Sequence, residues 1–336
     1  MMKLRARRVG ALLGMLVAFA LVAAACGSPS KSPLQSASAG GTAASGGTAA
    51  SGGSPAGDCT IGMTQINQTA VFFTQMNEGA TEAAKSAGCK LSIANANNDS
   101  AKQNSDIENF VTQGVTALIV VAIDVNGVLP AVKAARDKGI KVVAIDAKLE
   151  DGAVETFIGV DNAKAGEAIG QYAVKNGLTS GISYGVVDAK NSFIQNQRED
   201  GFRKVVDAAG AKYTQSVSGD NVQEKAAAAA TNLVTAQPGL AFVYTTGEPA
   251  TVGAVAALKG NATTKIIGWD LTKEVIGGLD EGIVVAIVQQ DPKQEGVAAV
   301  NELKSLMGGG SAKGFIDVPI TVVDKSNLEP FRAIFP

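Results

Sequence analysis

Short apolar runs recur along the chain from about residue 60 onward. Runs of this length, rich in valine and isoleucine, predict buried β-strands. Because they are almost continuously apolar, they are typical of parallel sheets that are covered on both faces. We expect strands at Thr60–Gln65, Lys90–Ala94, Ala117–Ile123, Lys141–Ile145, Thr156–Val160, Ile182–Val187, Leu240–Thr245, Lys265–Trp269 and Ile283–Val288.

Between these runs, apolar residues return at every third or fourth position, which predicts helices with one buried face. Three of the stretches end at a glycine, a common helix stop. Their faces are Ile107, Phe110 and Val111 before Gly114, then Val128, Leu129, Val132 and Ala135 before Gly139, and Phe202, Val205 and Val206 before Gly210. Alternating strands and helices predict an α/β fold with doubly wound parallel sheets. The folded part, 58–336, is long enough for two such lobes.

The N-terminal segment differs from this pattern. A basic start precedes an apolar run, Val9 to Ala25, that is short for a membrane-spanning helix. The run ends in Val-Ala-Ala-Ala-Cys-Gly, which resembles a bacterial lipobox with Cys26 as the lipidated residue. We therefore expect a lipoprotein signal peptide over 1–26 and an extracytoplasmic protein that is lipid-anchored to the cell membrane. The alternatives are an ordinary cleaved signal with an incidental Cys26 and a retained membrane anchor.

Residues 27–57 are rich in glycine, alanine, serine and threonine, and they contain the repeat GGTAASGGTAASGGS. A segment with so little apolar bulk cannot bury a core, so it predicts a flexible linker. A long tether on a lipid anchor gives the folded part the reach to meet other molecules at the membrane face.

Two further cysteines, Cys59 and Cys89, come directly before the first two predicted strands. If those strands are parallel neighbours, the two sulfur atoms could meet, and an oxidising compartment would permit a disulfide. Two buried free thiols are the alternative. A CxxC redox or metal motif is absent from the sequence.

The composition removes several classes of function. The chain has no histidine, which excludes a Ser-His-Asp triad, a histidine-based zinc site and a histidine general base. Without residues 1–26 it carries 25 basic and 31 acidic residues, a balance that does not favour nucleic acid. No GxxxxGK[ST] motif is present, so any ATP-driven step belongs to another protein. We expect no metal and no other cofactor.

Polar residues follow the predicted strands, where an open parallel sheet binds its ligand. Carboxylate and amide groups around a pocket can hold vicinal hydroxyl groups. Asp and Asn in these places also cap the helices that follow, which is the alternative for each single residue. These positions are Gln65 to Asn67, Asn95 to Asn98, Asp124, Asp146, Asp188, Thr246 to Glu248, Asp270, and Gln289 to Asp291.

From Cys59 to about Asp324 the chain resembles the type I periplasmic sugar-binding proteins of the ribose-binding kind. The matching blocks are, in order, FFTQMNEGATEAAKSAG, VTALIV, VLPAVKAARDKGIKVVAID, FIGVDNAKAGEAIG, QREDGF, VGAVAAL, IIGWD and AIVQQDPKQEG. The resemblance implies two lobes joined by a hinge of three chain crossings near Val160, Gln290 and residues 318–320. The N-terminal lobe would comprise 58–160 plus 291–318, and the C-terminal lobe 161–290 plus 319–336.

The resemblance also implies a function that is not enzymatic. Proteins of this family close over a ligand held between their lobes and present the closed form to a membrane permease. We therefore expect a monomeric solute-binding lipoprotein of an ABC importer. A receptor that feeds a chemotaxis or signalling partner is the alternative. A hydrolase using Asp146 and Asp270 as paired carboxylates is a further one, whereas the export signal contradicts a DNA-binding regulator of the same fold.

The family's site residues carry over to this sequence in part. Its two phenylalanines match Phe72 and Phe73, and its strand-end aspartates and glutamine match Asp146, Asp270 and Gln290. The expected ligand-binding residues are Phe72, Phe73, Asp146, Asn196, Asn221, Glu248, Asp270, Gln290 and Asn67.

The sequence departs from the family pattern at several positions. Ala147 and Asn196 stand where the family has arginines, and Asn221 stands where it has an aromatic residue. Gly247, next to Glu248, replaces an asparagine. With both cations and one aromatic gone, we expect a small neutral polyhydroxyl ligand, a pentose or linear polyol before a hexose. An anionic ligand is disfavoured, because the two aspartates would repel it with no cation to compensate.

Overall fold

The computed structural model describes residues 59–261 and 263–335, which form two six-stranded sheets covered by helices. The expected signal peptide over 1–26, the lipidation site at Cys26 and the linker over 27–57 lie outside the described residues. Each sheet with its covering helices is called a lobe here, the first lobe being the one that holds the N-terminal strands.

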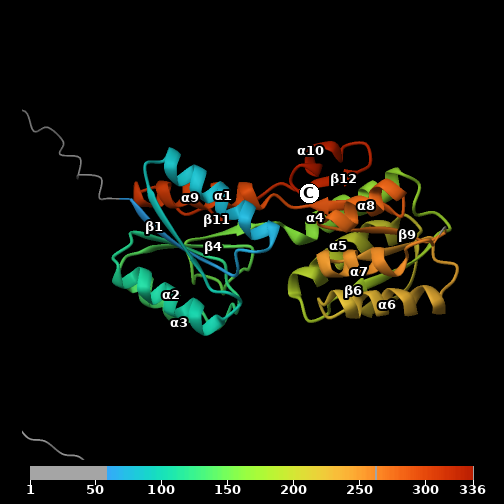
Figure 1. The fold of residues 1–336 in the computed structure, drawn as a ribbon, viewed down its shortest axis with the longest axis horizontal. Coiled ribbons are helices and arrows are strands. Elements are labelled where there is room, and N and C mark those ends of the chain that lie inside the picture. The colour runs from blue at the N-terminus through green and yellow to red at the C-terminus, as the bar shows by residue number, and fades with distance from the viewer. Residues whose placement is uncertain (1–58, 262, 336) are drawn as a thin grey trace, which may run out of the picture. The chain divides into compact units, whose positions relative to one another are not determined.

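The first lobe has six parallel strands in the order β11-β5-β4-β3-β1-β2. In Figure 1, helices α1 (Val71–Ser86) and α9 (Pro292–Met307) lie on one face of this sheet. Helices α2 (Ser100–Thr112) and α3 (Leu129–Asp137) lie on the other. The strands are β1 (Thr60–Gln65), β2 (Lys90–Asn95), β3 (Ala117–Val120), β4 (Lys141–Ile145), β5 (Thr156–Gly159) and β11 (Gly314–Asp317).

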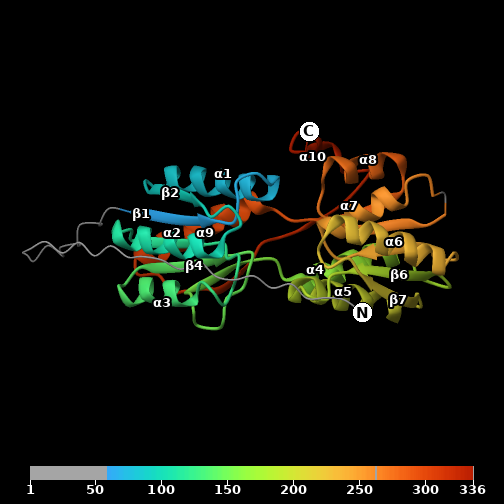
Figure 2. The ribbon, with the colours of Figure 1, turned by 60° about the horizontal axis from the view of Figure 1, so that its bottom comes forward.

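The second lobe has the order β12-β10-β9-β8-β6-β7, and only its edge strand β12 runs antiparallel. Its strands are β6 (Ser183–Asp188), β7 (Lys212–Ser218), β8 (Phe242–Thr245), β9 (Lys265–Trp269), β10 (Val284–Gln289) and β12 (Thr321–Asp324). Its helices are α4 (Asn162–Lys175), α5 (Phe193–Ala208), α6 (Gln223–Ala236), α7 (Glu248–Ala257), α8 (Lys273–Glu281) and the short α10 (Glu329–Arg332). Figure 2 shows α4 and α5 on the opposite side of the sheet from α6, α7 and α8.

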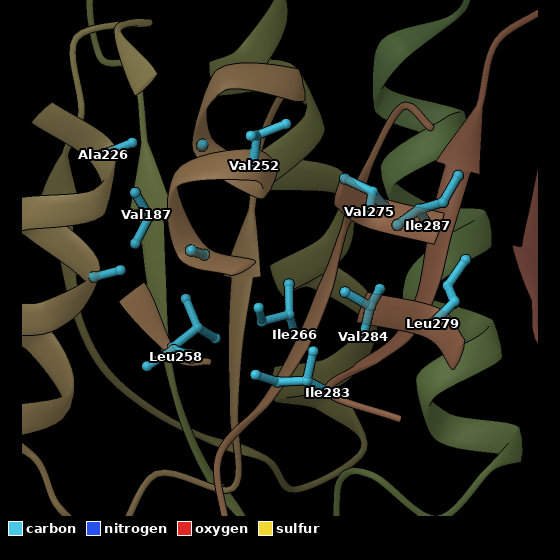
Figure 3. Close-up of a cluster of buried hydrophobic side chains, with 14 of the residues drawn as sticks. Val187, Ala226, Val252, Leu258, Ile266, Val275, Leu279, Ile283, Val284 and Ile287 are labelled. Atoms are coloured by element: carbon cyan, nitrogen blue, oxygen red, sulfur yellow. The ribbon is translucent and has the colours of Figure 1, made fainter. Parts of the chain in front are cut away.

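Each face of each sheet carries its own buried apolar cluster. Figure 3 shows the cluster in which Val187, Ile266 and Ile287 of the second sheet meet side chains of α6, α7 and α8. The opposite face is aromatic, with Phe202 stacked on Tyr244 at 3.9 Å and Tyr184 stacked on Phe242 at 5.1 Å. Two covered faces per sheet explain why the strand segments are almost continuously apolar.

All the predicted strands are present, and their ends shift by a few residues at most. The predicted helix stops are confirmed too, since Gly114, Gly139 and Gly210 have φ values of 72°, 84° and 91° that suit glycine. The sequence pattern did not predict β7, β11 or β12. Strand β7 reads KYTQSVS and lies at a sheet edge, so it lacks the apolar run by which the other strands were found.

The chain crosses between the lobes three times, after β5, after β10 and between β11 and β12. In the first two crossings an aspartate caps the helix that follows. Asp161 accepts a hydrogen bond from the backbone N–H of Lys164 at 3.1 Å, and Asp291 accepts one from Gln294 at 2.9 Å. These caps fix the starts of α4 and α9 at the point where the chain enters each lobe.

A disulfide joins Cys59 and Cys89, whose Cα atoms are 4.7 Å apart. The two residues directly precede β1 and β2, which are neighbouring parallel strands with Thr60 paired to Lys90. The bond therefore ties the amino ends of the two strands together, at the end of the sheet opposite to the strand-end residues Asn95 and Gln65.

Candidate ligand-binding site

A cavity of about 510 Å³ is lined by residues from both lobes. This size lies within the range typical of small-molecule sites. Most of the expected ligand-binding residues line this cavity. They are Phe72, Phe73, Asp146, Asn221, Glu248, Asp270 and Gln290. A larger hollow of about 800 Å³ lies beside α3 and the amino end of β4, away from these residues, where it is lined largely by charged side chains.

Two expected residues do not line the cavity. Asn67 organises its own loop, since its Oδ1 accepts hydrogen bonds from the backbone N–H groups of Thr69 and Ala70. Asn196 donates from Nδ2 to the backbone oxygen of Lys190 at 3.2 Å. Asn196 does not line the cavity because successive residues of a helix are rotated by about 100°, and α5 turns Gln195 and Arg198 toward the cavity instead.

Asp146 and Asp270 follow β4 and β9 directly, and both have left-handed backbone conformations with φ values of 64° and 60°. Asp and Asn tolerate this conformation better than most residues. The backbone N–H of Asp146 donates to Ile158 at 2.9 Å, and that of Asp270 donates to Val288 at 2.8 Å. Each aspartate is therefore held by the adjacent strand while its side chain meets the cavity.

Arg198 is a cation inside the site, where the sequence analysis expected none. Its side chain is 4% exposed, and its guanidinium lies 3.8 Å from the centre of the Trp269 ring. Nε donates to Asn162 at 2.7 Å and Nη1 to the backbone oxygen of Thr246 at 3.2 Å. Nη2 lies 3.4 Å from Oε1 of Gln290. Each terminal nitrogen keeps a second N–H for which the described residues supply no acceptor.

The prediction of a site without cations is therefore wrong. Ala147 and Asn196 replace the family's arginines, but the pocket keeps a positive charge because Arg198, two residues after Asn196 on the same helix, lines it. Arg198 lies three residues after Gln195, which places both side chains on one face of α5, but neither residue follows a strand and neither was predicted.

The aspartates and the arginine influence one another. Burial raises the pKa of Asp146 and of Asp270, while Arg198 lowers both and so favours their charged forms. Asp270 raises the pKa of Asp146 further. Burial lowers the pKa of Arg198, and Asp270 and Asp146 oppose this shift. The two lobes thus contribute one carboxylate each around a shared cation.

Gln290 connects these groups at the crossing after β10. Its Nε2 donates to Oδ1 of Asp270 at 2.9 Å, and its Oε1 faces Arg198. The preceding residue, Gln289, accepts from the backbone N–H of Leu271 at 2.8 Å and donates to the backbone oxygen of Gln290 at 2.8 Å. Asp270 is therefore positioned by Gln290, whereas no described residue donates a hydrogen bond to the side chain of Asp146.

A second polar group completes the second lobe's side of the cavity. Gln195 donates from Nε2 to Asn221 at 2.7 Å and accepts from the hydroxyl of Thr246 at 2.8 Å. Gly247 makes room for it, since a Cβ at that position would lie 2.9 Å from the amide carbon of Gln195. Glu248 is the first residue of α7 and lines the cavity. Loss of hydration at the cavity wall, followed by the nearby charge of Asp270, raises its pKa.

The first lobe contributes an apolar wall. Phe72 and Phe73 lie at the start of α1 with their rings 5.4 Å apart in an edge-to-face arrangement. Both are partly buried and pack against the first lobe's apolar cluster. Gln75, also on α1, lines the cavity, and its Nε2 is buried with no acceptor among the described residues. Four further residues line the cavity that were not predicted, because none of them directly follows a strand: Gln75, Gln195, Arg198 and Phe335.

The described part of the chain holds no group of three or more carboxylate or thiol side chains placed to bind a metal ion. Likewise, no described helix combines the length and apolar character needed to cross a membrane.

Residues 61–311 match the family described as periplasmic binding protein domain. The ribose import binding protein of Bacillus subtilis is 28% identical over 263 residues, which cover 78% of this chain and 86% of that protein. An ABC transporter solute-binding protein of Mycobacterium smegmatis, solved with bound glycerol, is 30% identical with a TM-score of 0.70, over 82% of this chain and 97% of that one.

A sugar-binding protein of a sugar ABC transporter from Bacillus halodurans has the same fold, with a TM-score of 0.75 at 21% identity over 82% of this chain and all of that one. The family match covers most of the chain, and it agrees with the two doubly wound lobes and their three crossings. This chain belongs to the periplasmic binding protein family, with the type I fold.

Proposed function

We propose that the chain is an extracytoplasmic solute-binding lipoprotein that captures a small neutral sugar or sugar alcohol, a pentose or a linear polyol before a hexose, and delivers it to an ABC-type permease. The observation that carries the proposal is the mixture of fixed acceptors and donors around one cavity. Asp146 and Asp270 accept hydrogen bonds, while Arg198 and Gln75 have N–H groups to donate.

Hydroxyl groups suit such a site because each can donate to a carboxylate and accept from a guanidinium or amide. The cavity lining carries charges of both signs, since Asp146, Glu248 and Asp270 are acidic whereas Arg198 and Lys273 are basic. An anionic ligand would meet both carboxylates, and a cationic ligand would meet the guanidinium. A neutral polyhydroxyl compound avoids both penalties.

The aromatic wall of Phe72 and Phe73 supports the same class of ligand, because the C–H edges of a sugar or polyol are apolar. Relatives named for ribose and for D-ribose/D-allose are 28% identical to this chain, and the structure solved with bound glycerol is 30% identical. We extend their ligand class, small polyhydroxyl compounds, to this chain.

The remaining parts of the proposal concern the setting. The lobes would span 58–160 plus 291–318 and 161–290 plus 319–336, and would close over the ligand about the three crossings. The protein would act as a monomer, held to the cell membrane by a lipid on Cys26. Mass spectrometry of membrane-extracted protein tests the anchor. A diacylglyceryl adduct on Cys26 is expected, and a Cys26→Ser variant should be released without it.

Isothermal titration calorimetry with D-ribose, D-arabinose, ribitol, D-glucose and glycerol tests the ligand class. We expect saturable binding of at least one pentose or pentitol, and weaker binding of D-glucose. A ligand that binds only the folded state at a hundredfold excess over Kd adds about 2.7 kcal/mol to the free energy of unfolding, so a thermal shift should accompany it. No binding to any member of this panel would contradict the proposal, and recovery of an altered compound would indicate an enzyme.

A further inference from the structure

The C-terminal segment of the described chain returns to the ligand cavity. After β12 the chain forms α10 and then places Phe335 in the cavity lining. Phe335 is the only aromatic side chain that the second lobe contributes to this lining within the described residues, beside Phe72 and Phe73 of the first lobe. At the position where the family has a second-lobe aromatic residue, this chain has Asn221.

This segment is anchored on α8. Figures 1 and 2 both show α10 beside that helix. Arg332 makes a two-pronged ion pair with Asp280 of α8, with N–O distances of 3.0 and 2.7 Å, and a further hydrogen bond to Glu329 at 2.8 Å. Lys325 donates to the backbone oxygen of Asp280 at 3.0 Å. The contacts place the segment against one particular helix.

Apolar packing adds to this anchoring. Leu328 is fully buried, and Phe331 and Phe335 pack against the apolar cluster that covers the α8 face of the second sheet. The backbone N–H of Phe335 lies 3.3 Å from the oxygen of Phe331, which closes a turn. Helix α8 in turn begins at the cavity, because Leu271, Thr272 and Lys273 line it. The segment is thus fastened to the same element that forms part of the site.

We propose that Phe335 is a ligand-contacting residue that determines specificity, and that it supplies from the C-terminal segment the second lobe's aromatic surface. An aromatic face packs best on the apolar C–H face of a ring, which a linear polyol does not present. Phe335 therefore favours a cyclic pentose over the linear pentitol of the same carbon count. This inference rests on the proposed function and decides between the two ligand classes that the function leaves open.

The chain offers a matched control. Ile334 is the adjacent residue, it is 41% exposed, and it does not line the cavity. Ile334→Ala therefore removes apolar bulk from the same turn without altering the site. Phe335→Leu keeps an apolar side chain against the cluster but removes the aromatic face, so it separates a contact with ligand from a role in packing.

Calorimetry at 25 °C with D-ribose and ribitol on the full-length protein tests the inference. Phe335→Ala and Phe335→Leu should each weaken D-ribose binding by about three- to tenfold, on the energy of one aromatic contact, and should change ribitol binding by less than about twofold. Ile334→Ala should leave both affinities as in the parent protein.

Equal weakening of both ligands by Phe335→Ala, or unchanged D-ribose affinity in both Phe335 variants, would overturn the role of Phe335 while leaving the proposed function intact. A parent protein that binds neither compound, nor any other member of the sugar panel, would remove the proposed function and this inference together. A parent that binds only ribitol would refute the preference for a ring.

Discussion

The two lobes repeat one strand order, with β6–β10 of the second sheet taking the places of β1–β5 of the first. The helices α1 and α9 of the first lobe correspond to α5 and α4 of the second, and each pair crosses at two glycines. In the first lobe, a Cβ on Gly79 or Gly296 would lie 1.9 or 2.2 Å from a backbone oxygen of the partner helix. In the second lobe, Gly201 and Gly166 are as close to their partners, at 2.1 and 2.3 Å.

These crossings align the helices residue by residue. Gly296 contacts the backbone oxygen of Met76, and Gly166 contacts that of Arg198, so Met76 and Arg198 occupy equivalent places. Counting back along both helices, Phe73 corresponds to Gln195, and Phe72 corresponds to Ile194. One helix position thus supplies an aromatic wall in the first lobe and hydrogen-bonding groups in the second.

The strand ends repeat as well. The non-glycine residues with positive φ among the described residues are Asn97, Asn98 and Asp146 in the first lobe, and Asp220, Asn221 and Asp270 in the second. Both sets follow the corresponding strands. The backbone frame of the site is therefore shared by the lobes, whereas the side chains on α1 and α5 make the cavity apolar on one side and polar on the other.

The largest expected effect comes from removing the disulfide, which the first lobe has and the second lobe lacks. Ile182 and Ala211 precede β6 and β7 where Cys59 and Cys89 precede β1 and β2. In the chain-entropy model, opening a loop with a sequence separation of 30 costs about 4 kcal/mol. We expect the Cys59→Ala/Cys89→Ala variant to lose about this much stability in urea unfolding. Parent protein treated with reductant is the control, and it should behave alike.

A double variant as stable as the oxidised parent would show that the bond does not constrain the first lobe. Hydrogen exchange adds a sharper test of the comparison. Amides of β1 and β2 should lose protection in the variant, while those of β6 and β7 should not.

Arg198→Met gives the second lobe the residue that the first lobe has at Met76. The change leaves Asn162, the backbone oxygen of Thr246 and Gln290 without their donor, and removes the cation between the two aspartates. Loss of one partner from a buried charged group costs about 3 kcal/mol in stability, and we expect ligand affinity to fall about a hundredfold or more. Calorimetry and urea unfolding measure the two effects.

Arg203→Met is the matched control, because Arg203 lies on the same helix, stacks on Tyr213 at 3.7 Å and does not line the cavity. It should leave affinity unchanged. If Arg198→Met binds ligand as tightly as the parent does, Arg198 contributes only to stability, and the amides and carboxylates of the site account for ligand affinity.

Asp146 and Asp270 occupy equivalent backbone positions in the two lobes, and substituting each one tests whether both bind ligand. Asp146→Asn and Asp270→Asn should each weaken binding by about ten- to a hundredfold, since a hydrogen bond to a charged acceptor contributes about 1.5–3 kcal/mol. Neither should lower the melting temperature of the ligand-free protein by much, because both side chains face the cavity. Asp124→Asn is the control, since Asp124 only caps its own loop by accepting from Asn126 and Gly127. An effect from one aspartate alone would show that the lobes do not contribute equally.

Sequence patterns predicted the sheets well because burial on both faces leaves a continuous apolar run, which β7 and β12 at the edges do not have. They also predicted that Asp146 and Asp270 face the cavity, since a residue directly after a strand in the middle of a parallel sheet lies at the carboxyl edge of that sheet. They missed Arg198 and Gln195 because the face of a helix depends on its rotation, which the glycine crossings set. The position of Phe335 could not be predicted from the sequence, since only the tertiary contact of α10 with α8 brings this residue to the cavity.

The last expected effect concerns Glu295 on α9, whose counterpart on α4 is Ala165, each one residue before the crossing glycine. Glu295 is fully buried, and neither carboxylate oxygen has a partner among the described residues. Burial raises its pKa well above the ordinary value, and the charges of Asp146, Asp291 and Asp270 raise it further. The folded protein therefore holds a proton on Glu295 at a pH where the unfolded chain, with a pKa of about 4.3, has released it.

The sign of the pH dependence follows from this difference. Below about pH 4, Glu295 is protonated in both the folded and the unfolded state, and its contribution to the free energy of unfolding is complete. As pH rises from there toward the folded-state pKa, the unfolded chain releases this proton first, and that contribution to stability is lost. Glu295→Gln cannot ionise, so this variant should be more stable than the parent at pH 7 and 8, with the gap closing as pH falls to 4. Urea unfolding at these pH values measures it. A gap that stays constant with pH would mean that Glu295 is ionised in the folded protein, where Arg198, the one cation that lowers its pKa, would have to compensate it.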